Sequence, residues 1–124
     1  MRKYIITPAL LAIVCMVMCH CTFNRKASVA ANEYLIQGEL ANLPDSIVIG
    51  LYEEDGNILN CVLRDTLMNG QFSFRDTVST TRKMLIMSDN RGFPGTWLEV
   101  WIAPGEYIEI KGQDKLVKTW EVVS

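Results

Sequence analysis

Histidine is almost absent from this sequence. The single histidine, His20, lies near the N-terminus. Nucleophilic triads and most zinc sites need an imidazole or several thiols, so these two classes are excluded. Thiol redox catalysis of the thioredoxin type needs a Cys-x-x-Cys motif, which is also missing. We therefore expect no cofactor, no metal and no catalytic constellation, and predict a non-enzymatic protein.

Cysteine is scarce beyond residue 21, where only Cys61 remains. No disulfide can form within that part of the chain without a second thiol. Cys61 lies in the alternating segment Leu59, Cys61 and Leu63, where a thiol is expected to behave as a small buried apolar group.

Basic residues are too few for a nucleic-acid partner. Residues 31–124 hold all 14 acidic residues but only 8 of the 12 Lys and Arg, a formal balance of 8 minus 14, or −6. Nucleic-acid binding needs a basic surface that neutralises phosphates, so this partner is excluded. A segment of this size permits a single hydrophobic core, and we predict one domain over residues 33–124.

The first 21 residues have the layout of an export signal. Arg2 and Lys3 give a positive start, and a mainly apolar stretch follows from Ile5 to Met18. A retained membrane anchor is the alternative, but a membrane-crossing helix needs roughly 20 apolar residues and this run is shorter. We expect a helical signal segment that is removed or lipidated.

Cysteines at the end of the apolar run resemble a bacterial lipoprotein signal, in which a cysteine becomes the lipidated N-terminus. Cys19 is the first candidate for lipidation and Cys21 the second, although neither follows the usual small residue. The alternative is a cut after Ala30, where Ser28 and Ala30 supply the small residues that a soluble-export peptidase recognises. Residues 22–32 are expected to form a short tether.

Helical periodicity is missing from residues 33–124, where apolar residues recur with a period of two between turn sequences. Asn69-Gly70 favours a tight hairpin and Pro104-Gly105 a type II turn, so mostly antiparallel pairing is expected. The segments predicted as strands are 33–38, 46–53, 59–67, 71–76, 83–88, 97–102, 106–111 and 118–123.

Antiparallel strands with one apolar face each need a second layer, and without helices that layer is another sheet. We therefore predict an all-β antiparallel β-sandwich of seven to eight short strands, with a small barrel as the alternative. The predicted core consists of Ile36, Ile47, Ile49, Leu51, Leu63, Phe72, Phe74, Leu85, Leu98, Val100, Ile102, Ile108, Ile110 and Val122.

The segment from Gly95 to Ile102 carries the strongest candidate for a binding surface. A period of two puts its aliphatic residues on one face and Trp97, Glu99 and Trp101 on the other. Two tryptophans beside a carboxylate suit a protein partner or a sugar, because tryptophan combines large contact area with a polar group. The alternative is that the two rings cover the rim of the sandwich or pack beneath the loop before them.

Carboxylates gather at one predicted turn, where Glu53, Glu54 and Asp55 precede Gly56. Acid-base hydrolysis by this cluster is a distant alternative, since charge at a turn usually means solvation. Glu53, Asp55 and Asn57, and separately Asp89-Asn90, resemble parts of a calcium loop, but neither has enough ligands. Arg64-Asp65-Thr66 recurs as Arg75-Asp76-Thr77, and we expect these two runs to form cross-strand charge contacts.

Four segments resemble an uncharacterised β-sandwich domain of bacterial envelope lipoproteins. They are Tyr34–Gly38, Arg64–Thr66, Asn69–Phe74 and Ala103–Gly112, and the resemblance spans about residues 33–123. In that family the domain typically precedes a thioredoxin-like domain of the thiol:disulfide interchange or peroxiredoxin-related type. Residues 118–124 resemble the strand that leads toward the redox domain, which this chain lacks, so a stand-alone version or a truncated product is expected.

The resemblance implies an accessory or interaction domain in the bacterial cell envelope. The expected partners are a membrane, through the N-terminal lipid, and an envelope protein such as a thioredoxin-like protein. The expected location is the periplasmic side of the outer membrane, or the periplasm if the chain is cut at Ala30. The alternative function is a carbohydrate-binding module that uses Trp97 and Trp101.

Overall fold

The computed structural model describes residues 28–90, 93 and 96–124. It contains eight strands: β1 (Glu33–Leu40), β2 (Val48–Asp55), β3 (Ile58–Thr66), β4 (Gln71–Thr77), β5 (Arg82–Met87), β6 (Leu98–Ile102), β7 (Tyr107–Gly112) and β8 (Glu121–Val123). A short 3-10 helix, η1 (Val117–Thr119), precedes β8. The predicted helical signal segment lies outside the described residues.

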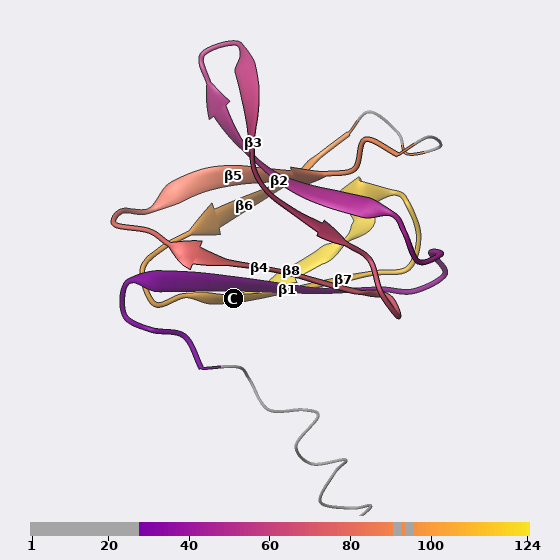
Figure 1. Ribbon diagram of the computed structural model, residues 1–124, viewed down its shortest axis with the longest axis horizontal. Helices are drawn as coiled ribbons and strands as arrows, with labels where there is room; N and C mark the ends of the chain where they lie inside the picture. Colours follow the sequence, from indigo (N-terminus) through magenta and orange to yellow (C-terminus); the bar gives the residue numbers. More distant parts are fainter. Residues whose placement is uncertain (1–27, 91–92, 94–95) are drawn as a thin grey trace, which may run out of the picture.

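The strands form two four-stranded sheets, with the orders β4-β1-β7-β8 and β3-β2-β5-β6. Figure 1 shows the sheets as two stacked layers, with the β2–β3 hairpin projecting beyond them. All pairings are antiparallel except that of β1 with β7, which is parallel. The predicted all-β sandwich is confirmed.

A continuous core fills the space between the two sheets. Alternate residues of β1, β4, β5, β6 and β7 face inward, as a period of two requires, and the largest fully buried side chain is Phe74. The core also contains residues that the alternation pattern did not single out: Tyr34, Leu40, Leu67, Val78, Met84, Ile86, Val117 and Trp120.

Four predicted core positions lie differently. Leu63 and Leu98 are only partly buried against the core, and Val122 is exposed because β8 is a three-residue edge strand. Leu85 is buried, but it lies outside the inter-sheet cluster. Its neighbours Met84 and Ile86 face the core, so Leu85 faces the outside of its sheet.

Only Glu121–Val123 of the last predicted strand, 118–123, form a strand, and residues 118 and 119 belong to η1. The ring of Trp120 is buried in the core, and its Nε1 donates a hydrogen bond to the Asp114 carbonyl at 2.8 Å. Trp120, from the segment that resembled a leader toward another domain, is therefore part of the core of this one, while residues 121–124 are exposed.

The Asn69-Gly70 turn joins strands of different sheets. Both residues have positive φ, as a tight turn requires. The segments on either side of the turn, however, pair only through the isolated bridge between Met68 and Gln71. β3 then pairs with β2, and β4 pairs with β1. The local turn was predicted correctly, whereas the extended hairpin between β3 and β4 was wrong.

Candidate functional site

Trp97, Glu99 and Trp101 lie at the free edge of the β3-β2-β5-β6 sheet, on its outer face. The side chains of Val100 and Ile102 alternate with them and are buried in the core. Trp97 and Trp101 are 48% and 59% exposed, and Glu99 is exposed. The predicted alternation is therefore present, and rings of this exposure do not serve as a covered rim of the core.

Two buried side chains lie on the same outer face, next to the edge strand. Leu85 lies opposite Glu99, and Tyr52 lies opposite Leu85. Leu85 and Tyr52 are only 3% and 7% exposed although they face outward. The Tyr52 ring lies over Gly50, where an added Cβ would be 2.5 Å from the ring, and its hydroxyl donates to Asp89 Oδ2 at 2.8 Å. The exposed tryptophans thus continue an apolar layer that rests on the sheet.

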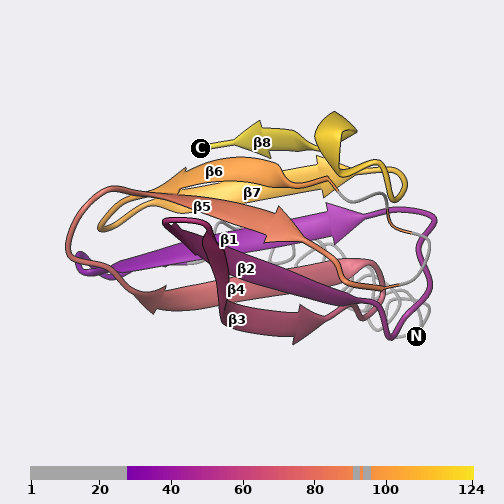
Figure 2. The ribbon, with the colours of Figure 1, turned by 90° about the horizontal axis from the view of Figure 1, so that it is seen from above.

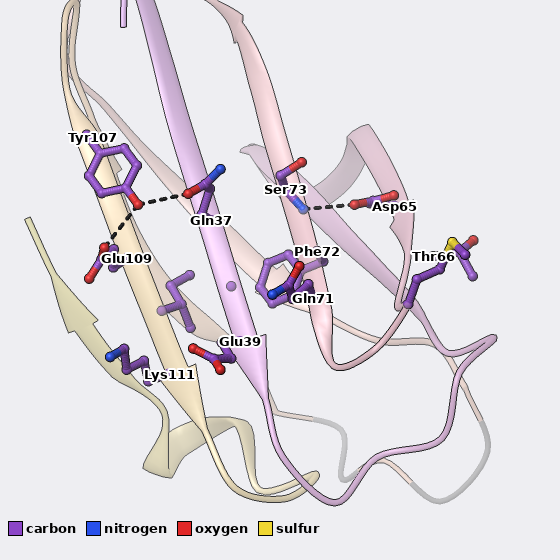
Figure 3. Close-up of a pocket in the computed structure, with 13 residues that line it drawn as sticks. Gln37, Glu39, Asp65, Thr66, Gln71, Phe72, Ser73, Tyr107, Glu109 and Lys111 are labelled. Carbon is purple, nitrogen blue, oxygen red and sulfur yellow. Dashed lines mark hydrogen bonds between the residues drawn. The ribbon is translucent and has the colours of Figure 1, made fainter. Parts of the chain in front are cut away.

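A groove of about 810 Å³ lies on the other sheet. Figure 3 shows that its floor is the outer face of β7, β1 and β4 and that the end of β3 stands at one side. Most of the side chains that line it are polar, and they come from four strands and the turn after β3: Gln37, Glu39, Asp65, Thr66, Met68, Gln71, Ser73, Tyr107, Glu109 and Lys111.

Hydrogen bonds fix several side chains in this groove. The Tyr107 hydroxyl lies 2.8 Å from Gln37 Oε1 and 3.0 Å from Glu109 Oε1. Asp65 Oδ2 accepts a hydrogen bond from the Ser73 backbone N–H at 2.8 Å. β4 is an edge strand, so no neighbouring strand accepts a hydrogen bond from the Ser73 N–H. The Asp65 carboxylate accepts it instead.

Three tyrosines have a raised pKa. Burial raises the pKa of Tyr34, Tyr52 and Tyr107 to about 12, with a further contribution from a nearby carboxylate in each case. That carboxylate is Asp76 for Tyr34, Asp89 for Tyr52 and Glu109 for Tyr107. The hydroxyls therefore remain neutral donors at neutral pH.

These pKa values predict a loss of stability in alkali. The folded-state pKa of about 12 exceeds the unfolded value of about 10, so the folded state holds these protons more tightly. The resulting stabilisation is complete below pH 10 and is lost as the pH rises from about 10 to 12. Absorbance titration at 295 nm and urea unfolding at pH 9 and 11 measure both effects. Ionisation of all the tyrosines near pH 10, with no change in the urea midpoint, would contradict this prediction.

The carboxylates of the β2–β3 turn do not form a catalytic cluster. Glu53 pairs with Arg82 at 2.9 Å, and Glu54 pairs with Lys83 at 3.6 Å. Asp55 is exposed at the end of the projecting hairpin (Figure 1). Two of the three carboxylates are thus paired with a cation, and none of the three lines the groove.

No three acidic, cysteine or histidine side chains come together as a metal site within the described part of the chain. The two partial calcium sequences have other contacts. Asp89 accepts from Tyr52, and Asn90 Oδ1 accepts from the Val48 backbone N–H at 2.8 Å. These contacts hold the end of β5 against β2.

The Arg-Asp-Thr repeat does not form the expected cross-strand charge contacts. Arg64 and Asp65 lie opposite Gly50 and Ile49 in one sheet, whereas Arg75 and Asp76 lie opposite Leu35 and Tyr34 in the other. The sheet change at the Asn69-Gly70 turn separates the two runs.

Cys61 is half-buried and not fully buried as predicted. The register between β2 and β3 shifts at Leu51 and Tyr52, so that Cys61 lies opposite Tyr52. Further along β3, Ile58 and Leu59 are 64% and 43% exposed, although they lie on opposite faces, because this end of the hairpin projects beyond the two sheets (Figure 1).

Cys19 and Cys21 lie outside the described residues, and no helix among residues 28–90 and 96–124 is long and apolar enough to cross a membrane. No protein-family model matches the chain, and no curated protein matches it significantly.

The groove was not predicted from the sequence. Its floor depends on the parallel pairing of β1 with β7, two strands that are about 70 residues apart in the chain. A weak signal existed, because Gln37 and Glu39 alternate with apolar residues, as do Glu109 and Lys111. Nothing local indicated that these four side chains would share one surface.

Proposed function

We propose that this chain is a non-enzymatic accessory domain of a bacterial cell-envelope lipoprotein, and that it binds another envelope protein. The observation that supports binding is the exposure of Trp97 and Trp101 on the outer face at a free sheet edge. Exposed apolar side chains that lie close together on a protein surface commonly mark an interaction site.

The chemistry of this surface favours a protein over a small polar ligand. Tryptophan is enriched among residues that dominate binding energy in protein interfaces. Polar groups are few here: Glu99 lies between the two tryptophans, and Lys83 lies opposite Trp101 and pairs with Glu54. A thioredoxin-like envelope protein is the proposed partner, and its support is the sequence resemblance.

The second candidate is a carbohydrate module on the same surface. Both indoles project from the same face of one extended segment. Because Trp97 and Trp101 are four residues apart, they lie about 13 Å from each other. Sugar rings could stack on such a pair. The small number of nearby hydrogen-bonding groups makes this the second choice.

Substitution of the tryptophans tests both functions. We expect Trp101→Ala and Trp97→Ala to weaken binding of the envelope partner about thirtyfold or more, because hot-spot residues cost about 2 kcal/mol or more when truncated. The measurement is quantitative capture from envelope extracts with the full chain as bait, followed by titration of the captured protein. Leu116→Ala is the matched control, since Leu116 is 50% exposed elsewhere on the surface.

Equal capture by Trp101→Ala and Leu116→Ala would refute the proposed surface. Binding to a glycan array that Trp101→Ala abolishes, without a protein partner, would instead support the carbohydrate module.

The proposed membrane attachment is tested at the two cysteines. We expect Cys19→Ala to abolish palmitate labelling and to shift the protein from the membrane fraction to the soluble fraction, while Cys21→Ala keeps both properties. Loss of labelling in Cys21→Ala alone would assign the lipid to Cys21. Cleavage after Ala30 with no label in the native chain would show free export instead.

A further inference from the structure

Nine side chains form a regular grid on the outer face of the β4-β1-β7-β8 sheet. The register of β1 with its two neighbours defines three rows across the strands. The rows are Gln71, Glu39 and Lys111; Ser73, Gln37 and Glu109; and Arg75, Leu35 and Tyr107. Neighbours within a row are about 5 Å apart, and successive rows are about 7 Å apart.

The first row offers three different polar groups without partners in the described structure. Glu39 and Lys111 lie side by side on adjacent strands, yet no ion pair joins them, and the Gln71 side chain makes no hydrogen bond. A carboxylate only accepts hydrogen bonds, an ammonium only donates, and an amide does both. Figure 3 shows these three side chains on β4, β1 and β7, where they line the groove.

The second and third rows are held in place by the protein itself. The Tyr107 hydroxyl reaches Gln37 and Glu109 in the next row, so the ring extends along the sheet and does not stand upright on it. In this orientation Tyr107 lines the groove together with Gln37 and Glu109. The side chains of Tyr107, Gln37 and Glu109 are thus held in place before any ligand binds. This lowers the entropic cost of binding.

The charges in the groove disfavour an anionic ligand. Three carboxylates, Glu39, Asp65 and Glu109, face one ammonium group, Lys111, and so repel phosphate and other anions. Asp65 and Glu109 each accept one hydrogen bond within the protein, from the Ser73 N–H and the Tyr107 hydroxyl, but they keep their negative charge, so a polycation is the competing ligand that the experiment must distinguish. The remaining pair, Glu39 and Lys111, is neutral as a unit.

The shape suits a ligand longer than one sugar ring. The three rows span about 13 Å along β1, and Asp65, Thr66 and Met68 from the end of β3 form one side. A volume of about 810 Å³ lies within the range of small-molecule sites. A neutral molecule with many hydroxyls matches this lining, because each hydroxyl both donates and accepts.

We propose that this groove binds a neutral di- or trisaccharide. Its hydroxyls bond to Gln71, Glu39 and Lys111 at one end, and a sugar ring packs its apolar face against Tyr107 at the other. This site is on the opposite sheet from Trp97 and Trp101, so it does not depend on the proposed protein-binding surface.

The test is binding of the purified full chain to a glycan array, followed by calorimetric titration with cellobiose, maltose, lactose and N,N′-diacetylchitobiose at millimolar concentration. Glu39→Gln and Lys111→Met should each reduce the affinity about tenfold or more, because hydrogen bonds to charged groups are among the strongest that a site can lose. Asp55→Asn is the matched control for Glu39→Gln, since it removes one carboxylate at the exposed β2–β3 turn. Lys118→Met is the control for Lys111→Met, because Lys118 is exposed outside the groove.

Saccharide binding that both groove variants lose and both controls keep, with unchanged unfolding midpoints, would support the proposal. Three outcomes would overturn it: no glycan bound, binding abolished by Trp101→Ala but kept by Glu39→Gln, or binding of tetralysine in place of any saccharide. None of these outcomes affects the test of the protein partner.

Discussion

Trp120→Ala should destabilise the protein by about 3–5 kcal/mol, the range for deletion of a buried large aromatic side chain. Trp120 is 4% exposed and joins the inter-sheet core. Its ring centroid lies 6.5 Å from that of Phe72, and its Nε1 donates to the Asp114 carbonyl. The substitution therefore removes apolar contacts and a hydrogen bond together. Total stabilities of domains are about 5–15 kcal/mol, so this one change is expected to leave little folded protein on warming.

Urea unfolding of the full chain, followed by far-UV circular dichroism, measures this loss. Trp101→Ala is the matched control, because it deletes the same side chain from a residue that is 59% exposed. Surface substitutions usually change stability by less than about 0.5 kcal/mol. A similar cost for the two variants would mean that the C-terminal segment is not part of the core.

The position of Trp120 shows where sequence patterns stop being informative. Alternation predicted that residues 118–123 form a strand, but residues 117–119 form η1 and only 121–123 form β8. From the sequence alone, Trp120 could lie exposed on a surface strand or buried between the two sheets. The choice depends on whether a space between the two sheets remains to be filled, which is a property of the whole fold.

Period-two alternation was reliable along β1, β4 and β7, whereas in β5 it put Leu85 in the core in place of Met84 and Ile86. It placed Ile36, Phe72, Phe74, Ile108 and Ile110 correctly, because burial of apolar surface fixes the register of such strands. It was wrong near the β2–β3 bulge, where the register shifts at Leu51 and Tyr52. An extra residue in one strand changes no local propensity, so the sequence carried little sign of it.

The two candidate sites differed in how far they were predictable. Trp97, Glu99 and Trp101 are neighbours in sequence, and one strand is enough to put them on one face. The groove is assembled from β1, β7, β4 and the end of β3, and its existence depends on strand order. Strand order follows from long-range pairing, which composition and spacing do not encode locally.

The arrangement of the two surfaces has a functional consequence. Figure 2 shows the two sheets from above, with β6 of one layer over β7 of the other. The tryptophan surface and the groove face away from each other on opposite layers, so a protein and a saccharide could bind at the same time without steric conflict. If both proposals hold, the domain would connect a protein partner to a glycan.

Gly38→Ala should cost about 3 kcal/mol, at the upper end of the range for overpacking of a core. An added Cβ at Gly38 would lie only 1.9 Å from Cε1 of Phe72. Phe72 has little freedom to move, since it is 3% exposed and its ring centroid lies 5.5 Å from that of Phe74. The methyl group therefore forces β1 and β4 apart or rotates a buried ring out of its preferred conformation.

Gly56→Ala is the control for this substitution. An added Cβ at Gly56 has no neighbour within 4 Å, and only its φ of +62° is unfavourable. It should therefore cost about 1 kcal/mol from backbone strain alone. Comparison of the two urea midpoints separates steric overlap from the general cost of replacing glycine.

A double-mutant cycle with Phe72→Leu identifies the clash itself. If the Phe72 ring is what the new methyl group meets, Gly38→Ala should cost markedly less in the Phe72→Leu background, with a coupling energy of about 0.5–3 kcal/mol. Additive costs would show that the two side chains do not meet. In that case the contact across β1 and β4, on which the floor of the groove rests, would be placed incorrectly.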